Sequence, residues 1–111
     1  MVRPKKHLGQ HFLRDENIAR KIISFLPQEP ANIIEIGAGT GALSKFLLME
    51  KKWNTRFFEI DRESISFLKT TWPEMQDRII EEDFLTYDLE KFPSPSFVIG
   101  NFPFVVMISD L

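Results

Sequence analysis

The chain has 111 residues, of which 43% are hydrophobic and 27% charged, so it suits one small globular domain and is not a disordered protein. It has no cysteine, which excludes disulfides and thiolate metal sites, and no apolar run approaches the roughly 20 residues that span a bilayer. Residues 1–31 carry six Lys or Arg against three Asp or Glu, and residues 32–111 carry eight against thirteen. The basic N-terminal segment indicates an anionic partner, with a solvated tail as the alternative.

The N-terminal segment is predicted to be an arm followed by a helix. Residues 1–14 have no helical period, and Pro4 and Gly9 favour an extended or turning chain. Asp15 is a candidate N-cap for a helix over residues 15–27. Its apolar face is expected to consist of Ile18, Ile22, Phe25 and Leu26. That face needs the following sheet, so no domain boundary is expected between them.

Strands and helices alternate over residues 32–111, which form the predicted core. The expected strands are residues 32–36, 55–60, 78–80 and 97–99, and the expected helices are 42–50 and 62–70. This alternation is typical of βαβ units, so the predicted fold class is α/β, with a parallel sheet and flanking helices. In such sheets ligands bind beyond the carboxyl ends of the strands.

Three glycines, Gly37, Gly39 and Gly41, follow the first predicted strand. Glycine tolerates positive φ and lets a ligand lie against the backbone, next to the N-terminus of a helix. Gly37, Gly39 and Ala42 satisfy the G-x-G-x-x-G/A pattern of a dinucleotide-binding turn, with Glu59 twenty residues after Gly39 as the ribose-binding acid. A carboxylate at Glu35 would instead repel a pyrophosphate and favour the cationic groups of S-adenosylmethionine. An ordinary turn that binds nothing is the remaining alternative.

Candidate binding residues stand at the carboxyl ends of all four predicted strands: Gly37, Glu59, Asp83 and Asn101. Glu59 could accept hydrogen bonds from ribose hydroxyls, and Asp83 could accept one from the amino group of an adenine. Phe84 could pack on the same ring. Each acid alone could equally be a surface residue. Because all four positions meet at one edge of the sheet, together they indicate a site more strongly than any single motif.

The tetrapeptide from Asn101 to Phe104 suits chemistry on the amino group of an adenine. The N6 lone pair is delocalised into the ring, and the Asn101 side chain and the Phe102 carbonyl could free it by accepting the N6 hydrogens. Pro103 keeps Phe102 extended, and Phe104 offers a ring face to an unstacked base. The pattern is short, and a strand end followed by a proline turn is the alternative.

These segments together resemble the bacterial ribosomal RNA adenine N6,N6-dimethyltransferases. The matching residues are 9–13, 35–43, 58–61, 82–84 and 100–104, within a resemblance that covers about residues 3–104. The resemblance implies a Rossmann-like S-adenosylmethionine-dependent methyltransferase fold whose last strands and helical RNA-binding domain are missing here. Residues 105–111 do not match the family's continuation. The chain is therefore expected to be a truncated N-terminal part and poorly active alone.

The resemblance also implies roles for individual residues. The implied ligands of S-adenosyl-L-methionine are His11, Leu13, Gly37, Glu59, Asp83 and Asn101, and the implied catalytic residues are Asn101 and Phe104. His11 replaces the usual Asn and Phe104 the commoner Tyr. The implied reaction is dimethylation of adenines in small-subunit ribosomal RNA, in the cytoplasm, on ribosomal RNA or the immature small subunit. Neither a membrane nor a metal is expected.

Two other functions remain open at this level. One is a non-catalytic RNA-binding or assembly module that keeps the basic arm. The other is a fragment of an NAD-binding oxidoreductase, against which Glu35 and the Asn101 tetrapeptide both count. Titration with S-adenosylmethionine and with NAD would separate the three possibilities.

Overall fold

The computed structural model describes residues 16–100 and 106–108. Their strands form one five-stranded sheet in the order β3-β2-β1-β4-β5. The strands are β1 (Ala31–Ile36), β2 (Trp53–Phe58), β3 (Ile79–Ile80), β4 (Ser96–Gly100) and β5 (Val106–Ile108). The first four run parallel, which confirms the predicted α/β class. β5 pairs antiparallel with β4, so the sheet is mixed, which the sequence did not predict.

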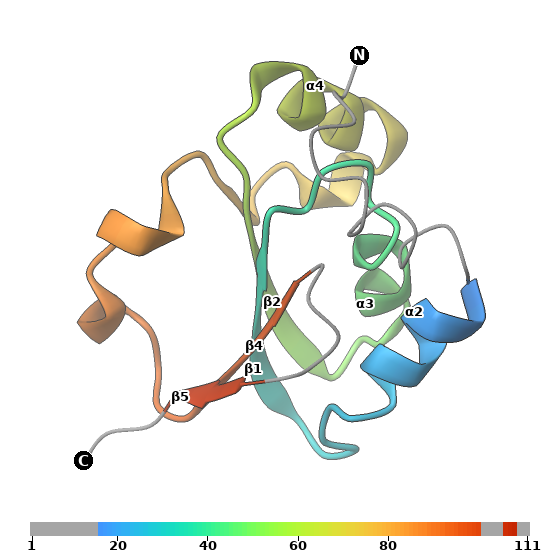
Figure 1. Ribbon diagram of the computed structural model, residues 1–111, viewed down its shortest axis with the longest axis vertical. Helices are drawn as coiled ribbons and strands as arrows, with labels where there is room; N and C mark the ends of the chain where they lie inside the picture. Colours follow the sequence, from blue (N-terminus) through green and yellow to red (C-terminus); the bar gives the residue numbers. More distant parts are fainter. Residues whose placement is uncertain (1–15, 101–105, 109–111) are drawn as a thin grey trace.

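In the described part of the chain, three helices cover one face of the sheet (Figure 1): α2 (Glu16–Ile23), α3 (Ser44–Met49) and α4 (Arg62–Thr71). A 3-10 turn, η1 (Pro73–Met75), follows α4. Two further 3-10 turns, η2 (Phe84–Thr86) and η3 (Leu89–Lys91), lie on the other side of the sheet. None of the described helices is long and apolar enough to cross a membrane.

Helix α2 ends at Ile23, although the sequence predicts a helix over residues 15–27. The N–H of Phe25 donates to the carbonyl of Ile22 at 3.1 Å, and that of Leu26 to Ile23 at 3.0 Å. These bonds to the third preceding residue tighten the chain. Leu26 therefore enters the core, whereas the Phe25 side chain is 58% exposed and does not belong to the predicted apolar face.

The main hydrophobic core lies between the sheet and the three helices. Successive strand residues point to opposite faces, so Ile33, Phe57 and Ile99 all point towards the helices and are fully buried. Leu47 of α3 and Leu68 of α4 meet them from the other side. The helical face therefore supplies most of the burial that holds the described residues together.

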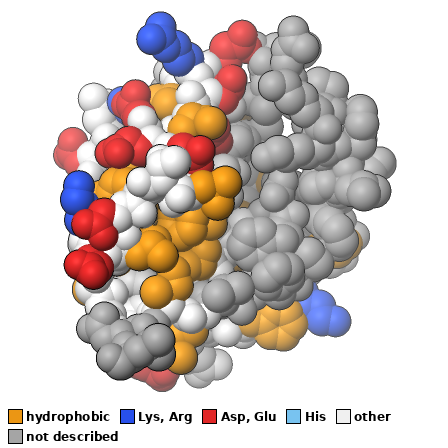
Figure 2. Space-filling model, turned by 60° about the vertical axis from the view of Figure 1, so that its left-hand side comes forward, with side chains coloured by type: hydrophobic (Ala, Val, Ile, Leu, Met, Phe, Trp, Pro, Cys, Tyr) orange, Lys and Arg blue, Asp and Glu red, His pale blue; other side chains and the backbone are white. Residues whose placement is uncertain are grey.

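The opposite face of the sheet carries a smaller cluster of buried residues, Ile34, Phe58 and Val98. Phe58 is its centre, because the rings of Phe84, Tyr87 and Phe92 pack edge-on against it at centroid distances of 5.2, 5.0 and 5.6 Å. Figure 2 brings this side forward and shows hydrophobic side chains gathered there among acidic ones. Leu85 and Leu89, from η2 and η3, are 88% and 43% exposed.

The strand register brings the carboxyl ends of three strands level with one another. Ile36, the last residue of β1, lies opposite Phe58 of β2 and Gly100 of β4. Gly37 and Glu59 are the next residues after β1 and β2, so they leave the sheet side by side. The register of the strands thus places the candidate residues Gly37 and Glu59 next to each other at this edge of the sheet, as predicted.

Candidate ligand-binding site at the glycine turn

The turn between β1 and α3 depends on three glycines with positive φ. Gly37, Gly39 and Gly41 have φ angles of 67°, 58° and 83°, which L side chains rarely adopt. The N–H groups of Gly37 and Ala38 both donate to the carbonyl of Phe58, at 2.8 and 3.2 Å. These bonds fasten the start of the turn to the end of β2.

The glycines at the two ends of the turn have different surroundings. A Cβ added to Gly37 would meet no atom of the described residues within 4 Å, so these residues leave the backbone there open to a ligand. A Cβ added to Gly41 would lie 2.2 Å from Cζ3 of Trp72. Gly37 therefore opens towards a ligand, whereas Gly41 is required for packing.

Glu59 closes the turn from the end of β2. Its Oε1 accepts the N–H of Gly39 at 2.7 Å, and its Oε2 accepts those of Ile60 and Asp61 at 3.1 and 3.0 Å. The side chain is 8% exposed. A carboxylate offers roughly four acceptor positions, so the three backbone bonds leave room for one ligand hydroxyl. Because the N–H of Gly39 already donates to Glu59, it cannot at the same time donate to a pyrophosphate.

Glu35 lies beneath the turn, inside the core, and is only 2% exposed. Burial raises its pKa to about 8; the hydrogen bond from Ser44 Oγ to its Oε1, 2.5 Å long, opposes the shift, and the nearby Glu59 adds to it. Glu35 is therefore mainly protonated at neutral pH. Glu35 is buried below the turn, and Glu59 is the carboxylate that contacts the turn, so Glu59 and not Glu35 is placed to act on a ligand there.

Asp83 follows β3 and caps η2, where its Oδ1 accepts the N–H of Leu85 at 2.9 Å. Its side chain is exposed, so a ligand that reaches the end of β3 can contact it. Phe84 was expected to pack on a ligand ring. Its ring lies edge-on to Phe58 in the second cluster and is partly exposed, so its packing on a ligand ring stays a prediction.

The structure brings three predicted site residues, Gly37, Glu59 and Asp83, to the carboxyl ends of the neighbouring strands β1, β2 and β3. Glu59 contacts the glycine turn directly through Gly39. The other predicted site residues, His11, Leu13, Asn101 and Phe104, lie outside the described residues. Among residues 16–100 and 106–108, no group of three His, Cys, Asp or Glu could hold a metal ion.

Sequence reasoning missed two residues that shape the turn. Ser44, fully buried at the start of α3, donates to Glu35. Serine near the start of a predicted helix usually indicates an N-cap, but Leu43 is the N-cap of α3, and nothing in the sequence indicated the bond from Ser44 to a buried acid. Trp72, at the end of α4, packs against Gly41 from thirty-one positions away, and nothing in the local sequence indicated this contact.

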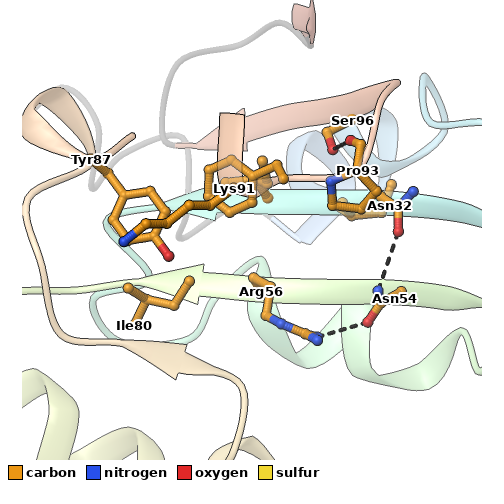
Figure 3. A pocket seen from close by; sticks show the side chains of 11 residues that line it. Asn32, Asn54, Arg56, Ile80, Tyr87, Lys91, Pro93 and Ser96 are labelled. Atoms are coloured by element: carbon orange, nitrogen blue, oxygen red, sulfur yellow. Dashed lines mark hydrogen bonds between the residues drawn. The ribbon is translucent and has the colours of Figure 1, made fainter. Parts of the chain in front are cut away.

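A separate pocket of about 150 Å³ lies on the opposite face of the sheet (Figure 3). It contains a polar ladder in which Arg56 Nη1 donates to Asn54 Oδ1 at 2.7 Å and Asn54 Nδ2 donates to Asn32 Oδ1 at 3.2 Å. Lys91 runs across it towards the ring of Tyr87. None of the predicted site residues lines this pocket, so the candidate site remains the glycine turn.

Comparison with known proteins points to one family. A sequence profile described as Ribosomal RNA adenine dimethylase matches residues 1–108. The chain is 47% identical over 106 residues to Ribosomal RNA small subunit methyltransferase A of Flavobacterium johnsoniae, covering 93% of this chain and 40% of that protein. It is 50% identical over 107 residues to the protein of the same name from Porphyromonas gingivalis, covering 93% and 41%. The chain thus spans about two fifths of these relatives.

Among solved structures, the fold is similar to that of a proposed S-adenosyl-L-methionine-dependent methyltransferase from Methanococcus maripaludis. The TM-score is 0.55 at 16% sequence identity, and the match covers 87% of this chain and 59% of that one. At this identity the likeness concerns the fold alone. It confirms the predicted Rossmann-like methyltransferase fold class.

Proposed function

The chain belongs to the ribosomal RNA adenine dimethylase family, and on this premise we propose that it is part of an S-adenosyl-L-methionine-dependent enzyme that dimethylates N6 of adenines in small-subunit ribosomal RNA. One observation carries the cofactor part of the proposal. The glycine turn is open at Gly37 and is closed at Gly39 by the carboxylate of Glu59. This arrangement suits a nucleoside with a cationic substituent better than a pyrophosphate.

The described residues fit the proposed cofactor. The open backbone at Gly37 suits the methionine end, the remaining acceptor position of Glu59 suits a ribose hydroxyl, and the exposed Asp83 suits the adenine amino group. His11 and Leu13 are proposed to lie over the methionine end, on the basis of the family resemblance. When bound, S-adenosyl-L-methionine supplies a methyl group on a positively charged sulfur.

We assign the reaction itself to the tetrapeptide from Asn101 to Phe104, which follows β4 in the sequence. Asn101 and the carbonyl of Phe102 would accept the hydrogens of the target N6 and localise its lone pair for attack on the methyl carbon. The bond between that carbon and sulfur would break as the new C–N bond forms, leaving a neutral thioether, and the methylated nitrogen would then release its proton to solvent. Phe104 would stack on the target base once it leaves its helix. The protein's contribution in this scheme is positioning and hydrogen bonding.

The proposed partner is ribosomal RNA in the immature small subunit, and the proposed place of action is the cytoplasm. The names of the similar proteins from Flavobacterium johnsoniae and Porphyromonas gingivalis support the substrate class. The excess of Lys and Arg in residues 1–31 supports contact with an anionic partner.

Replacing Glu59 by Ala is expected to weaken binding of S-adenosyl-L-methionine by about 1.5–3 kcal/mol, the scale of hydrogen bonds to a charged acceptor. The loss of affinity has two sources. The ligand loses a hydrogen-bond acceptor, and the N–H of Gly39 loses the carboxylate that holds it in place. Titration calorimetry measures the affinity, and the exposed Glu74, replaced by Ala, is the matched control. Equal affinity for S-adenosyl-L-methionine in the native chain and the Glu59 variant would show that Glu59 does not take part in binding the cofactor.

The reaction can be tested in a chimera in which residues 1–104 replace the matching part of the Flavobacterium johnsoniae relative. The chimera is expected to transfer labelled methyl groups to immature small subunits. Asn101→Ala should abolish this transfer and leave cofactor affinity nearly unchanged, because Asn101 is proposed to act mainly on the target amino group. Near-normal methylation by the Asn101 variant would contradict the proposed mechanism.

A further inference from the structure

The glycine turn is held at three points, and the third is Trp72, the residue that follows α4. Gly37 is fixed by the carbonyl of Phe58 and Gly39 by the carboxylate of Glu59, both from the end of β2. Gly41 is held differently, by direct packing against the indole of Trp72. The first two contacts are hydrogen bonds at the edge of the sheet, whereas the third is a packing contact from the residue that follows α4.

The position of Trp72 follows from the way α4 ends. The residue before a proline is disfavoured in helical conformation, and Trp72, which precedes Pro73, has φ −128° and ψ 85°. Its N–H still donates to Leu68 at 2.8 Å, and its carbonyl accepts the N–H of Met75 at 2.9 Å. Hydrogen bonds therefore fix the backbone of Trp72 on both sides, and its side chain does not follow the helical path of α4.

The indole lies where a side chain at position 41 would be. Two of its atoms, Cζ3 and Cη2, are 2.2 and 2.6 Å from the position of a Cβ on Gly41. Phe67 supports the ring edge-on, with centroids 6.3 Å apart and an interplanar angle of 86°. The ring is half-buried and packs against the main core.

Gly41 also connects the turn to α3. Its N–H donates to Ala38 at 2.9 Å, and its carbonyl accepts the N–H of Lys45 at 3.0 Å. A displacement of Gly41 would thus move both the turn and the start of α3, where Ser44 donates to Glu35.

We infer that Trp72 is a positioning residue that holds the glycine turn in its ligand-binding shape and thereby raises the affinity for the cofactor. Trp72 acts through Gly41 and does not itself need to touch the cofactor. The inference rests on the proposed function, because it assigns a further residue to the same site. It goes beyond that function by making α4, through one side chain, a determinant of cofactor affinity.

The chain contains two tryptophans, which provides a matched control. Trp53 is 7% exposed, donates from Nε1 to the carbonyl of Pro27 at 3.0 Å, and stands at the opposite end of β2 from Glu59. Trp53→Phe should lower the stability of the protein without reaching the turn. This variant therefore shows how cofactor affinity changes when an indole is lost far from the glycine turn.

Cofactor affinity is measured by calorimetry with S-adenosyl-L-methionine, under conditions in which each variant is fully folded. Trp72→Ala is expected to weaken binding by about tenfold or more, because the turn must then be ordered on binding. Trp72→Phe, which keeps an aromatic ring, should recover most of that loss, and Trp53→Phe should bind like the native chain. Equal losses in the Trp72→Ala and Trp53→Phe variants, or none in Trp72→Ala, would overturn the inference.

Amide hydrogen exchange tests the same inference without a cofactor. In Trp72→Ala the N–H groups of Gly39 and Gly41 should exchange about tenfold faster than in the native chain, while amides of β1 and β4 change much less. Uniform acceleration of all amides would show that Trp72 serves global stability alone and would overturn the inference. If the native chain fails to bind the cofactor, the proposed cofactor site fails for this chain, and the exchange result still decides whether Trp72 holds the glycine turn.

Discussion

The native chain is expected to lose stability between about pH 5 and pH 8, and replacing Glu35 by Gln is expected to remove most of that loss. Burial raises the pKa of Glu35 to about 8 in the folded protein, from its ordinary value of 4.5. Between these two values the unfolded chain releases the proton and the folded chain retains it. The free energy of unfolding therefore falls as pH rises through this window, by an amount on the order of several kcal/mol. Above the folded pKa the loss is complete.

Glutamine has nearly the same shape, carries no proton to lose, and can accept the hydrogen bond from Ser44. At pH 5 the Glu35→Gln variant and the native chain should have similar stability, and at pH 8 the variant should be the more stable. Urea unfolding at a series of pH values measures the difference. Glu74→Gln, at an exposed position, should keep the native pH profile. A variant at Glu35 with an unchanged slope would show that this carboxyl is ionised in the folded protein.

Replacing Gly41 by Ala is expected to destabilise the protein more than replacing any other glycine of the turn. The new Cβ would overlap the indole of Trp72, 2.2 Å away, and its backbone would be strained at φ 83°. Left-handed backbone costs about 1–2 kcal/mol and overpacking about 1–3, so the expected loss is roughly 2–5 kcal/mol. Gly37→Ala, with similar φ but open surroundings, should lose only the backbone part.

The two contributions at Gly41 can be separated in a Trp72→Ala background. With the indole removed, the further cost of Gly41→Ala should fall to roughly the 1–2 kcal/mol of backbone strain. Urea unfolding followed by circular dichroism provides the four stabilities. Equal costs of Gly41→Ala with and without Trp72 would mean that the indole moves aside freely, which would also weaken the case for Trp72 as a positioning residue.

Local patterns identified β1, β2, β4 and the helices between them, because these elements show a period or a continuous apolar run, and the apolar pair Ile79–Ile80 marked the short β3. The apolar run before Gly37 predicted β1 closely, since a buried strand has a continuous apolar sequence. β5 was missed because the three residues Val106–Ile108 are too few to show an alternation, and their pairing with β4 depends on contact across the sheet. The end of α2 was missed because its last turn is set by packing of Leu26 into the core.

The sequence by itself determined where the candidate site lies. Gly37, Glu59 and Asp83 follow strands of one parallel sheet, and the direction of the strands alone brings them to one edge. Only the tertiary structure decided how these groups work together. It buried Glu35 and raised its pKa, used Glu59 to hold Gly39, and placed Trp72 against Gly41. The reason is physical. Desolvation and packing depend on every atom around a group, including atoms far away in the sequence. The parallel direction of the strands, in contrast, follows from the alternation of strands and helices along the chain.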